Sequence, residues 1–297
     1  MPHHIGPARV TLREAGHILG SASVALELPK SRVVLIGDLG RSSTPLLRDF
    51  VTGWSAPVDM VVMESTYGSR GHRCDQLEAR RKLAAAVRRA VAQRGHLLIP
   101  AFAIGRTQTI LYHLNHLVEA REVPPIPVAV DTPMGIRVTE LHTDSTGLFD
   151  DEALALLDAG DNPLDFDALY AVRRGRDSDR LRELPGPMVV IAGSGMCTGG
   201  RIVRHLRDRL PHPETTVLLV GYQTPGTPGH VLQRAAPGDA VHLRRDDVVV
   251  AAQVDSLPGL SAHADRTTWL HSIPVQPRVA LHHGDPGSQE SLAKSLG

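Results

Sequence analysis

The chain has 297 residues, of which 42% are hydrophobic and only 3% aromatic, so it can form one large domain or two ordinary ones with a core of Val, Leu, Ile and Ala. Lys and Arg total 32, as do Asp and Glu, and this zero net charge argues against a protein coated in positive charge for nucleic acid, although a local basic groove stays open. Two cysteines exclude a disulfide framework and suit a reducing cytoplasm, and no apolar run reaches the roughly 18 residues of a membrane span.

The first part of the chain is rich in short strands. The runs RVTLRE, SVALEL and RVVLIGD are separated by Gly, Pro and Ser, which predicts successive antiparallel strands. His17 lies between Gly16 and Gly20, at the tip of the first predicted hairpin. The run VDMVVMEST predicts a further buried strand that ends on Glu64.

From about residue 68 the hydrophobic period becomes helical. The run QLEARRKLAAAVRRAVAQRG predicts a helix with its C-cap at Gly95, and TQTILYHLNHLVEA predicts a second helix. Strands are predicted in HLLIP, PIPVAV, PMVVIA and TTVLLV, and this alternation favours a mostly parallel sheet wrapped by helices. Short pieces return after about residue 258, so we expect an α/β domain inserted into a strand-rich one.

Three predicted strand ends carry side chains that suit a metal site. Asp38 follows a strand in LIGDLG, His283 follows one in ALHHGDPG, and His17 follows the first. Each alone has an ordinary explanation, as a turn aspartate or a structural histidine. Together they raise the prospect of zinc, because imidazole and carboxylate are suitable ligands and catalytic sites gather them from distant segments.

Two loops of the predicted α/β domain favour an anionic substrate. AGSGMCTGGR is a Gly-rich loop between strand and helix that includes Arg201, and PAFAIGRTQT places Arg106 at a helix start. A plain strand-to-helix turn remains the alternative for each. His263, in GLSAHAD, lies at a loop-to-helix junction, where it acts either as part of a helix cap or as a positioned acid or base.

Read together, AGHILGSA, GDLGR, MESTYG, PAFAIGRTQ, SGMCTGGR, YQTPGTPG, SAHAD and HHGD resemble, in order, the motifs of β-CASP ribonucleases with the metallo-β-lactamase fold. The resemblance implies an α/β fold: part of an αββα lactamase sandwich over residues 1–67 and 259–297, with an inserted β-CASP domain over residues 68–258. It further implies a hydrolase that cleaves RNA in RNA processing, with two zinc ions per complete site and manganese as an alternative ion.

The resemblance also assigns roles to single residues. His17 and His283 resemble metal ligands, and Asp38 resembles the carboxylate that bridges the two ions. His263 resembles the histidine that protonates the leaving oxygen, and Glu64 the acidic residue that orients it.

For the substrate we expect phosphate contacts from Arg106, Ser194, Gly195 and Arg201, without base reading. The implied partner is RNA in single-stranded form, with no membrane, a cytoplasmic location and a homodimer left open. Whether cutting is internal or starts from one end stays undecided.

The family's main metal signature, His-x-His-x-Asp-His, does not occur in these 297 residues. His113 and His116, in YHLNHL, are interpreted as helix-face residues. The chain is therefore expected to begin partway through the lactamase domain, with an incomplete ligand set, impaired activity and exposed apolar faces. The alternative is a catalytically inactive RNA-binding or assembly subunit. His230 and Asp285 also stand where the family usually has arginine and glutamate.

Overall fold

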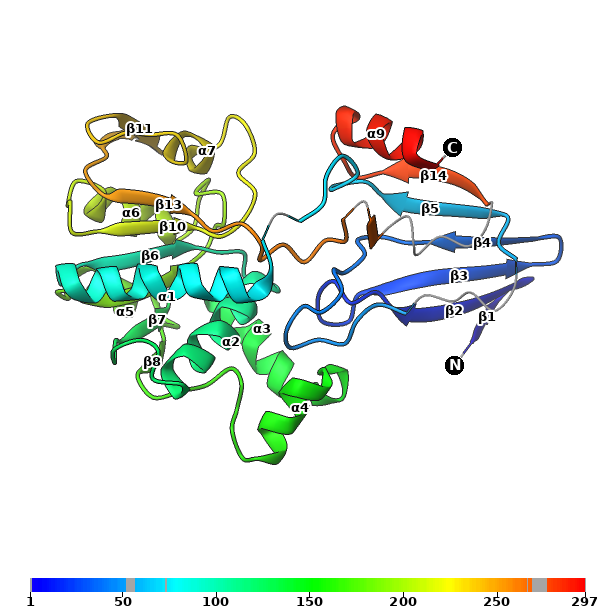
Figure 1. The fold of residues 1–297 in the computed structure, drawn as a ribbon, viewed down its shortest axis with the longest axis horizontal. Coiled ribbons are helices and arrows are strands. Elements are labelled where there is room, and N and C mark those ends of the chain that lie inside the picture. The colour runs from blue at the N-terminus through cyan, green and yellow to red at the C-terminus, as the bar shows by residue number, and fades with distance from the viewer. Residues whose placement is uncertain (1, 52–56, 73, 266, 269–276, 297) are drawn as a thin grey trace. The chain divides into compact units, whose positions relative to one another are not determined.

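The computed structural model describes residues 2–51, 57–72, 74–265, 267–268 and 277–296. The chain divides into two compact units, each described here by itself (Figure 1). The first unit comprises Met1–Arg73, Gly147–Leu154 and Ser261–Gly297, and the second comprises Cys74–Thr146 and Ala155–Leu260. Among the described residues, no helix is both long and apolar enough to cross a membrane.

The first unit is built on a six-stranded sheet in the order β1-β2-β3-β4-β5-β14. Its strands are β1 (His3–Ile5), β2 (Ala8–Glu14), β3 (Ala22–Leu28), β4 (Ser31–Leu35), β5 (Met60–Glu64) and β14 (Arg278–His282). β1 to β4 pair antiparallel, as was predicted for β2, β3 and β4, whereas β4, β5 and β14 run parallel. The parallel pairing of β5 with β14 joins segments more than 200 residues apart, and Figure 1 shows these strands side by side.

The two faces of this sheet differ in burial. One face forms a core with helix α9 (Pro286–Leu296), in which Val34, Val61, Met63 and Leu292 are fully buried. On the other face, the strand register aligns Leu12, Val24 and Leu35 across β2, β3 and β4; Leu12 and Leu35 are exposed and Val24 is half-buried. The exposed apolar face expected from the sequence is therefore present in this unit.

The second unit holds a six-stranded sheet in the order β13-β10-β6-β9-β7-β8, whose paired strands are all parallel. Its strands are β6 (His96–Pro100), β7 (Val128–Val130), β8 (Leu169–Ala171), β9 (Met188–Ala192), β10 (Thr216–Leu219) and β13 (Gln253–Ser256). β6 and β9 are buried at every residue, as continuous apolar runs in a sheet covered on both faces should be.

Helices surround this second sheet; in Figure 1, α1 lies in front of it and α6 behind. They are α1 (Gln76–Gln93), α2 (Arg106–Glu119), α3 (Pro133–Thr143), α5 (Gly175–Glu183), α6 (Ile202–Arg209) and α7 (Pro228–Leu232). The short helix α4 (Asp151–Asp158) crosses the boundary between the units, and the 3-10 helix η1 (Thr146–Leu148) precedes it. The mixed α/β class predicted from the sequence is confirmed.

Some local features differ from the sequence predictions. The hairpin of β11 (Ala240–Leu243) and β12 (Asp246–Val249) and the short strand β8 were not foreseen. The left-handed residue that ends α1 is Arg94, with φ +52°, not the predicted Gly95. Gly95 serves close packing instead, because a Cβ atom there would lie 1.8 Å from the carbonyl oxygen of Glu214.

Candidate metal centre

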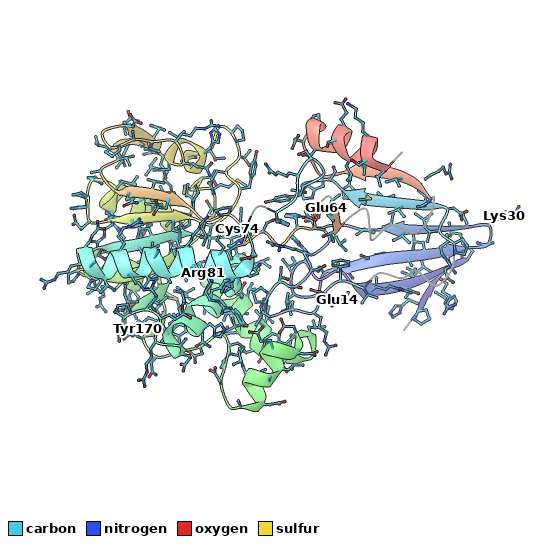
Figure 2. The ribbon with its side chains drawn as sticks, in the orientation of Figure 1. Glu14, Lys30, Glu64, Cys74, Arg81 and Tyr170 are labelled. Atoms are coloured by element: carbon cyan, nitrogen blue, oxygen red, sulfur yellow. The ribbon has the colours of Figure 1, made fainter. Side chains whose placement is uncertain are left out.

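The candidate site lies in the first unit, at one edge of its sheet. Asp38 follows β4, Glu64 ends β5 and His283 follows β14, and the carboxyl ends of parallel strands meet at the same edge. β2 is antiparallel to β3, which is antiparallel to β4, so the turn after β2 that carries His17 reaches this edge too. Figure 2 labels Glu64 at this end of β5. The topology thus gathers side chains from four distant segments.

Asp38 lies between the two candidate histidine ligands. Its Oδ1 atom is 2.6 Å from Nδ1 of His283, and its Oδ2 atom is 3.8 Å from Nε2 of His17. The two histidines thus approach opposite oxygens of one carboxylate. Ligand atoms on a tetrahedral zinc stand about 3.4 Å apart, since zinc–ligand bonds are about 2.1 Å long. The spacing toward His17 fits that value, while an ion on the other side would replace the direct contact between Asp38 and His283.

His17 is prepared to act as a neutral ligand. Burial, and then the neighbouring His263, lower the pKa of its imidazole, outweighing the opposing effect of Asp38. Its buried Nδ1 atom has no partner in good hydrogen-bond geometry within the described part of the chain, and a weaker hydrogen bond to the Ala262 backbone carbonyl raises the pKa of the ring only in part. Metal-ligating histidines commonly turn their second nitrogen toward such a carbonyl. The donor set therefore fits a divalent cation.

Two loops are held in contact beneath this site. The Gly40 N–H donates to the Ala15 carbonyl at 2.7 Å, and a Cβ atom on Gly40 would lie only 2.0 Å from the Gly16 carbonyl oxygen. The turn that carries His17 can approach the Asp38 loop only because Gly40 lacks a side chain. Gly40 also forms an isolated bridge with His263, which fixes the segment of the site's third histidine.

His263 is oriented by a buried carboxylate. Its Nδ1 atom lies 3.0 Å from both oxygens of Glu64, whose side chain is fully buried. Glu64 also accepts hydrogen bonds from Leu39 N at 3.0 Å and from the Thr66 hydroxyl. Because a carboxylate accepts, Nδ1 of His263 carries the proton. The His263 ring centroid is 4.4 Å from that of His17, so His263 lies next to a candidate metal ligand.

A second layer of contacts around His263 was missed at the sequence level. The Nε2 atom of His72 lies at 2.9 Å from the carbonyl oxygen of His263, and the backbone N–H of His72 donates to the Asp265 carboxylate at 3.1 Å. The Tyr67 ring lies 4.7 Å from that of His72 and stacks at 6.3 Å from that of His263. Burial lowers the pKa of His72. Nothing in the run GHRC signalled this role, because the contact joins residues 191 positions apart.

The residues expected to contact phosphate lie in the second unit. Ser194 and Gly195 belong to the loop after β9, where the Ser194 hydroxyl oxygen accepts from Thr198 N at 3.0 Å and Gly199 N at 3.2 Å. Arg106 begins α2, and its guanidinium donates to the Leu260 carbonyl. These residues lie at or just beyond the carboxyl ends of parallel strands, the edge at which α/β sheets usually bind ligands.

Arg201 has a different environment from the one expected. Its guanidinium donates to Asp131 at 2.7 Å, to the Val172 carbonyl at 2.8 Å and to the Arg173 carbonyl at 3.1 Å. Asp131 is fully buried and also accepts from His205 at 2.7 Å. The guanidinium is thus engaged within the protein, and its contact with phosphate stays a prediction.

Other residues considered in the sequence analysis are not among the candidate ligands. His113 and His116 lie on α2, as interpreted, and His113 is almost fully buried. His230 lies in α7, whose first turn is capped by Thr227. In the first unit, Asp285 begins α9 by accepting from the Ser288 backbone and hydroxyl, and these bonds lower the pKa of its carboxyl group.

Comparison with known proteins supports the resemblance. One matching family model is the Beta-Casp domain, over residues 107–232, and another is the Zn-dependent metallo-hydrolase RNA specificity domain, over residues 247–297. The chain is 35% identical to ribonuclease TTHA0252 of Thermus thermophilus, and the matched region covers 98% of this chain and 66% of that protein. It is 29% identical to transcription termination factor FttA of Pyrococcus horikoshii, and 28% to that of Methanosarcina mazei. It covers 46% and 47% of these two proteins, about half their length.

The two models match in the order that the sequence motifs predicted, and the relatives match over nearly the whole chain. Both models fall on segments whose motifs carried the resemblance, including SGMCTGGR in the first and SAHAD and HHGD in the second. The chain belongs to the β-CASP family of metallo-β-lactamase-fold ribonucleases.

Proposed function

We propose that this chain provides part of the active centre of a metal-dependent ribonuclease that hydrolyses RNA phosphodiester bonds. The observation that carries the proposal is the Asp38 carboxylate standing between His17 and His283, next to the pair of His263 and Glu64. The name of the Thermus relative, a ribonuclease, and the description of the second family model, an RNA specificity domain, favour RNA as the substrate.

His17, Asp38 and His283 would hold the metal, zinc or manganese. Asp38 belongs to two groups of possible ligand atoms within 4.8 Å of one another, with His17 and His263 in one and with Glu64 and His283 in the other. A divalent cation bound there would polarise the phosphate and would lower the pKa of a bound water molecule toward neutral pH. The low pKa of His17 keeps its imidazole neutral and available as a ligand at pH 7. A complete two-metal centre needs more ligands than these three residues supply.

His263 would supply the proton that the leaving oxygen requires. Its Nδ1–H is held by Glu64, so the ring is fixed in one orientation and Nε2 is the atom that can exchange a proton. The buried carboxylate stabilises the imidazolium form, and loss of the proton leaves a neutral ring still bound to Glu64. The Leu39 and Thr66 bonds fix Glu64 itself.

Substitution of Asp38 tests the proposal. The chain would be joined in frame to an N-terminal segment that carries His-x-His-x-Asp-His, and cleavage of a labelled single-stranded RNA would be followed with zinc or manganese. We expect cleavage by the joined protein, and its loss in D38A together with bound metal. Unchanged cleavage in D38A would refute the assignment, and no cleavage by a folded, metal-loaded joined protein would refute the ribonuclease function.

A second candidate function is that of a catalytically inactive RNA-binding or assembly subunit. The observation that favours it is the lack of His-x-His-x-Asp-His within the 297 residues. The two candidates differ in one measurement: the inactive subunit would bind RNA without cleaving it, in the joined protein as well as in the chain alone. For the chain alone we expect weak metal binding and little cleavage, because metal affinity depends on the number of ligands.

A further inference from the structure

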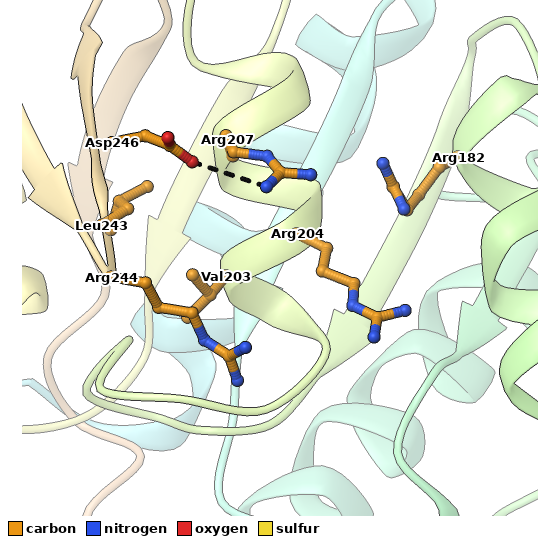
Figure 3. A pocket seen from close by; sticks show the side chains of 7 residues that line it. All are labelled: Arg182, Val203, Arg204, Arg207, Leu243, Arg244 and Asp246. Atoms are coloured by element: carbon orange, nitrogen blue, oxygen red, sulfur yellow. Dashed lines mark hydrogen bonds and ion pairs between the residues drawn. The ribbon is translucent and has the colours of Figure 1, made fainter.

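A pocket of about 310 Å³ in the second unit is surrounded by arginines from three elements (Figure 3). Arg204 and Arg207 project from α6, Arg182 comes from the end of α5, and Arg244 comes from the turn between β11 and β12. The buried side chains of Val203 and Leu243 also line it. Its volume is within the range of small-ligand sites, about 300–1,000 Å³.

The pocket concentrates positive charge in a chain whose overall formal charge is zero. Four guanidinium groups line it together with the carboxylate of Asp246, and Asp179 and Asp208, which are not part of the lining, pair with three of the four. Arg204 and Arg207 are three residues apart, so they share the outer face of α6, and their side chains are each 47% exposed. Four guanidinium groups against these three carboxylates leave a small local excess of positive charge, of the kind that the overall composition left open.

Ion pairs orient these arginines without using all their donors. Arg204 contacts Asp179 at 3.1 Å, and Arg207 contacts Asp246 at 3.4 Å and Asp208 at 3.5 Å. Arg182 is more engaged, because one nitrogen contacts Asp179 at 3.2 Å and a second pairs with Asp208. A guanidinium has five N–H donors, so these contacts leave donors on Arg204 and Arg207. Exposed pairs such as that of Arg204 with Asp179 contribute roughly 0–1 kcal/mol, so an incoming anion can exchange with them.

The turn that carries Arg244 is short and fixed. It has two residues between paired strands, and Arg244 has φ +61°, a left-handed conformation that such turns usually give to Gly or Asn. An arginine at this position extends the basic lining from α6 to the hairpin.

The chemistry of the lining indicates the kind of ligand. Guanidinium forks bind phosphate in two-pronged geometry, and none of the described residues that line the pocket has an aromatic ring on which a base could stack. The described lining also holds no histidine or cysteine, which favours binding over catalysis. We propose that this pocket binds backbone phosphates of the RNA strand, as an auxiliary site that holds substrate without reading its sequence. This inference rests on the proposed function, since it takes RNA as the occupant.

Removal of two arginines tests the pocket through binding, independently of cleavage. Affinity of the full chain for a fluorescent single-stranded RNA would be measured by anisotropy at several salt concentrations, for the wild type and R204Q/R244Q. R81Q/K82Q, which removes two exposed charges from α1, is the matched control. Each lost phosphate contact should weaken binding about fivefold at 0.1 M salt and reduce the slope of log K against log salt by about 0.7.

We therefore expect a loss of about 25-fold in R204Q/R244Q and a slope lower by about 1.4, with little change in the control. R204K/R244K, which keeps the charges but lacks the forks, should lie between the wild type and R204Q/R244Q. Equal affinity and slope in R204Q/R244Q and the wild type would overturn the proposal, as would an equal loss in the control.

Binding of inorganic pyrophosphate, measured by calorimetry, separates the occupants. If the wild type binds pyrophosphate through these arginines but binds no RNA, the pocket serves a small phosphate ligand and our assignment of RNA is wrong. If the joined protein cleaves RNA and R204Q/R244Q binds RNA as tightly as the wild type does, the proposed function stands and the pocket proposal alone fails.

Discussion

The buried histidine His113 should make the stability of the second unit depend on pH. Burial, followed by the nearby Arg80, lowers the pKa of its imidazole to about 3. Nδ1 of the ring lies 3.4 Å from Nε of Arg80, which donates to it, and Nε2 lies 3.1 Å from Oε1 of Gln76, which accepts from it. This pattern fits one neutral tautomer and has no place for a second ring proton.

The sign and size of the effect follow from proton uptake. Above pH 6.5 both folded and unfolded states hold His113 neutral, so no stability is lost. Between pH 6.5 and about 3 only the unfolded state takes up a proton, so the free energy of unfolding falls by about 1.4 kcal/mol per pH unit, or about 2 kcal/mol at pH 5. His96, whose pKa is lowered to about 4 by burial and then by Arg209, should contribute a similar loss.

Urea unfolding of the wild type and H113Q at pH 8 and pH 5 measures this effect. We expect the wild type to lose about 4 kcal/mol between the two pH values through these two histidines, and H113Q to lose about 2 kcal/mol less than that. H242Q is the control: His242 is exposed and its bond to Asp247 raises its pKa, so it acts with the opposite sign. If H113Q lost as much stability as the wild type, the assignment of His113 as a neutral structural histidine would be wrong.

Three further substitutions test separate parts of the structure. G40A should lower zinc affinity and cost about 1–3 kcal/mol of unfolding free energy, because its Cβ would meet the Gly16 carbonyl, whereas G37A meets nothing within 4 Å; calorimetry giving equal zinc affinities would contradict this. D131N should lower the free energy of unfolding, measured in urea, by about 3–5 kcal/mol, because it removes the buried carboxylate that accepts from Arg201 and His205. A decrease below about 1 kcal/mol would count against this network. In the joined protein, E64Q should slow RNA cleavage and leave metal content unchanged, since it alters only the support of His263; parallel loss of metal would make Glu64 a ligand.

The sequence predicted the parts of the fold that local pattern determines. The alternating runs before residue 36 and the buried strands β6 and β9 have strong periodicity, and the structure has them as strands. The close approach of Gly95 to Glu214 was not predictable, because the two residues are more than 100 positions apart. Propensity carries no information on such close approaches.

The candidate site was predictable in its members but not in its support. His17, Asp38 and His283 each follow a strand, and the structure brings them to one sheet edge. His72 could not be found from the sequence, because its contact to the His263 backbone depends on tertiary structure alone. The engagement of Arg201 by Asp131 was also hidden, since Gly-rich loops with an arginine look alike whether the arginine points to a ligand or into the protein.

The most direct test of the account is a crystal structure of the chain loaded with zinc, with the metal located by anomalous scattering. We expect zinc bound to Nε2 of His17 or to the His283 ring, with an oxygen of Asp38 among the ligands in either case. Zinc held elsewhere, for example by His113 and His116 on α2, with Asp38 uninvolved, would contradict it.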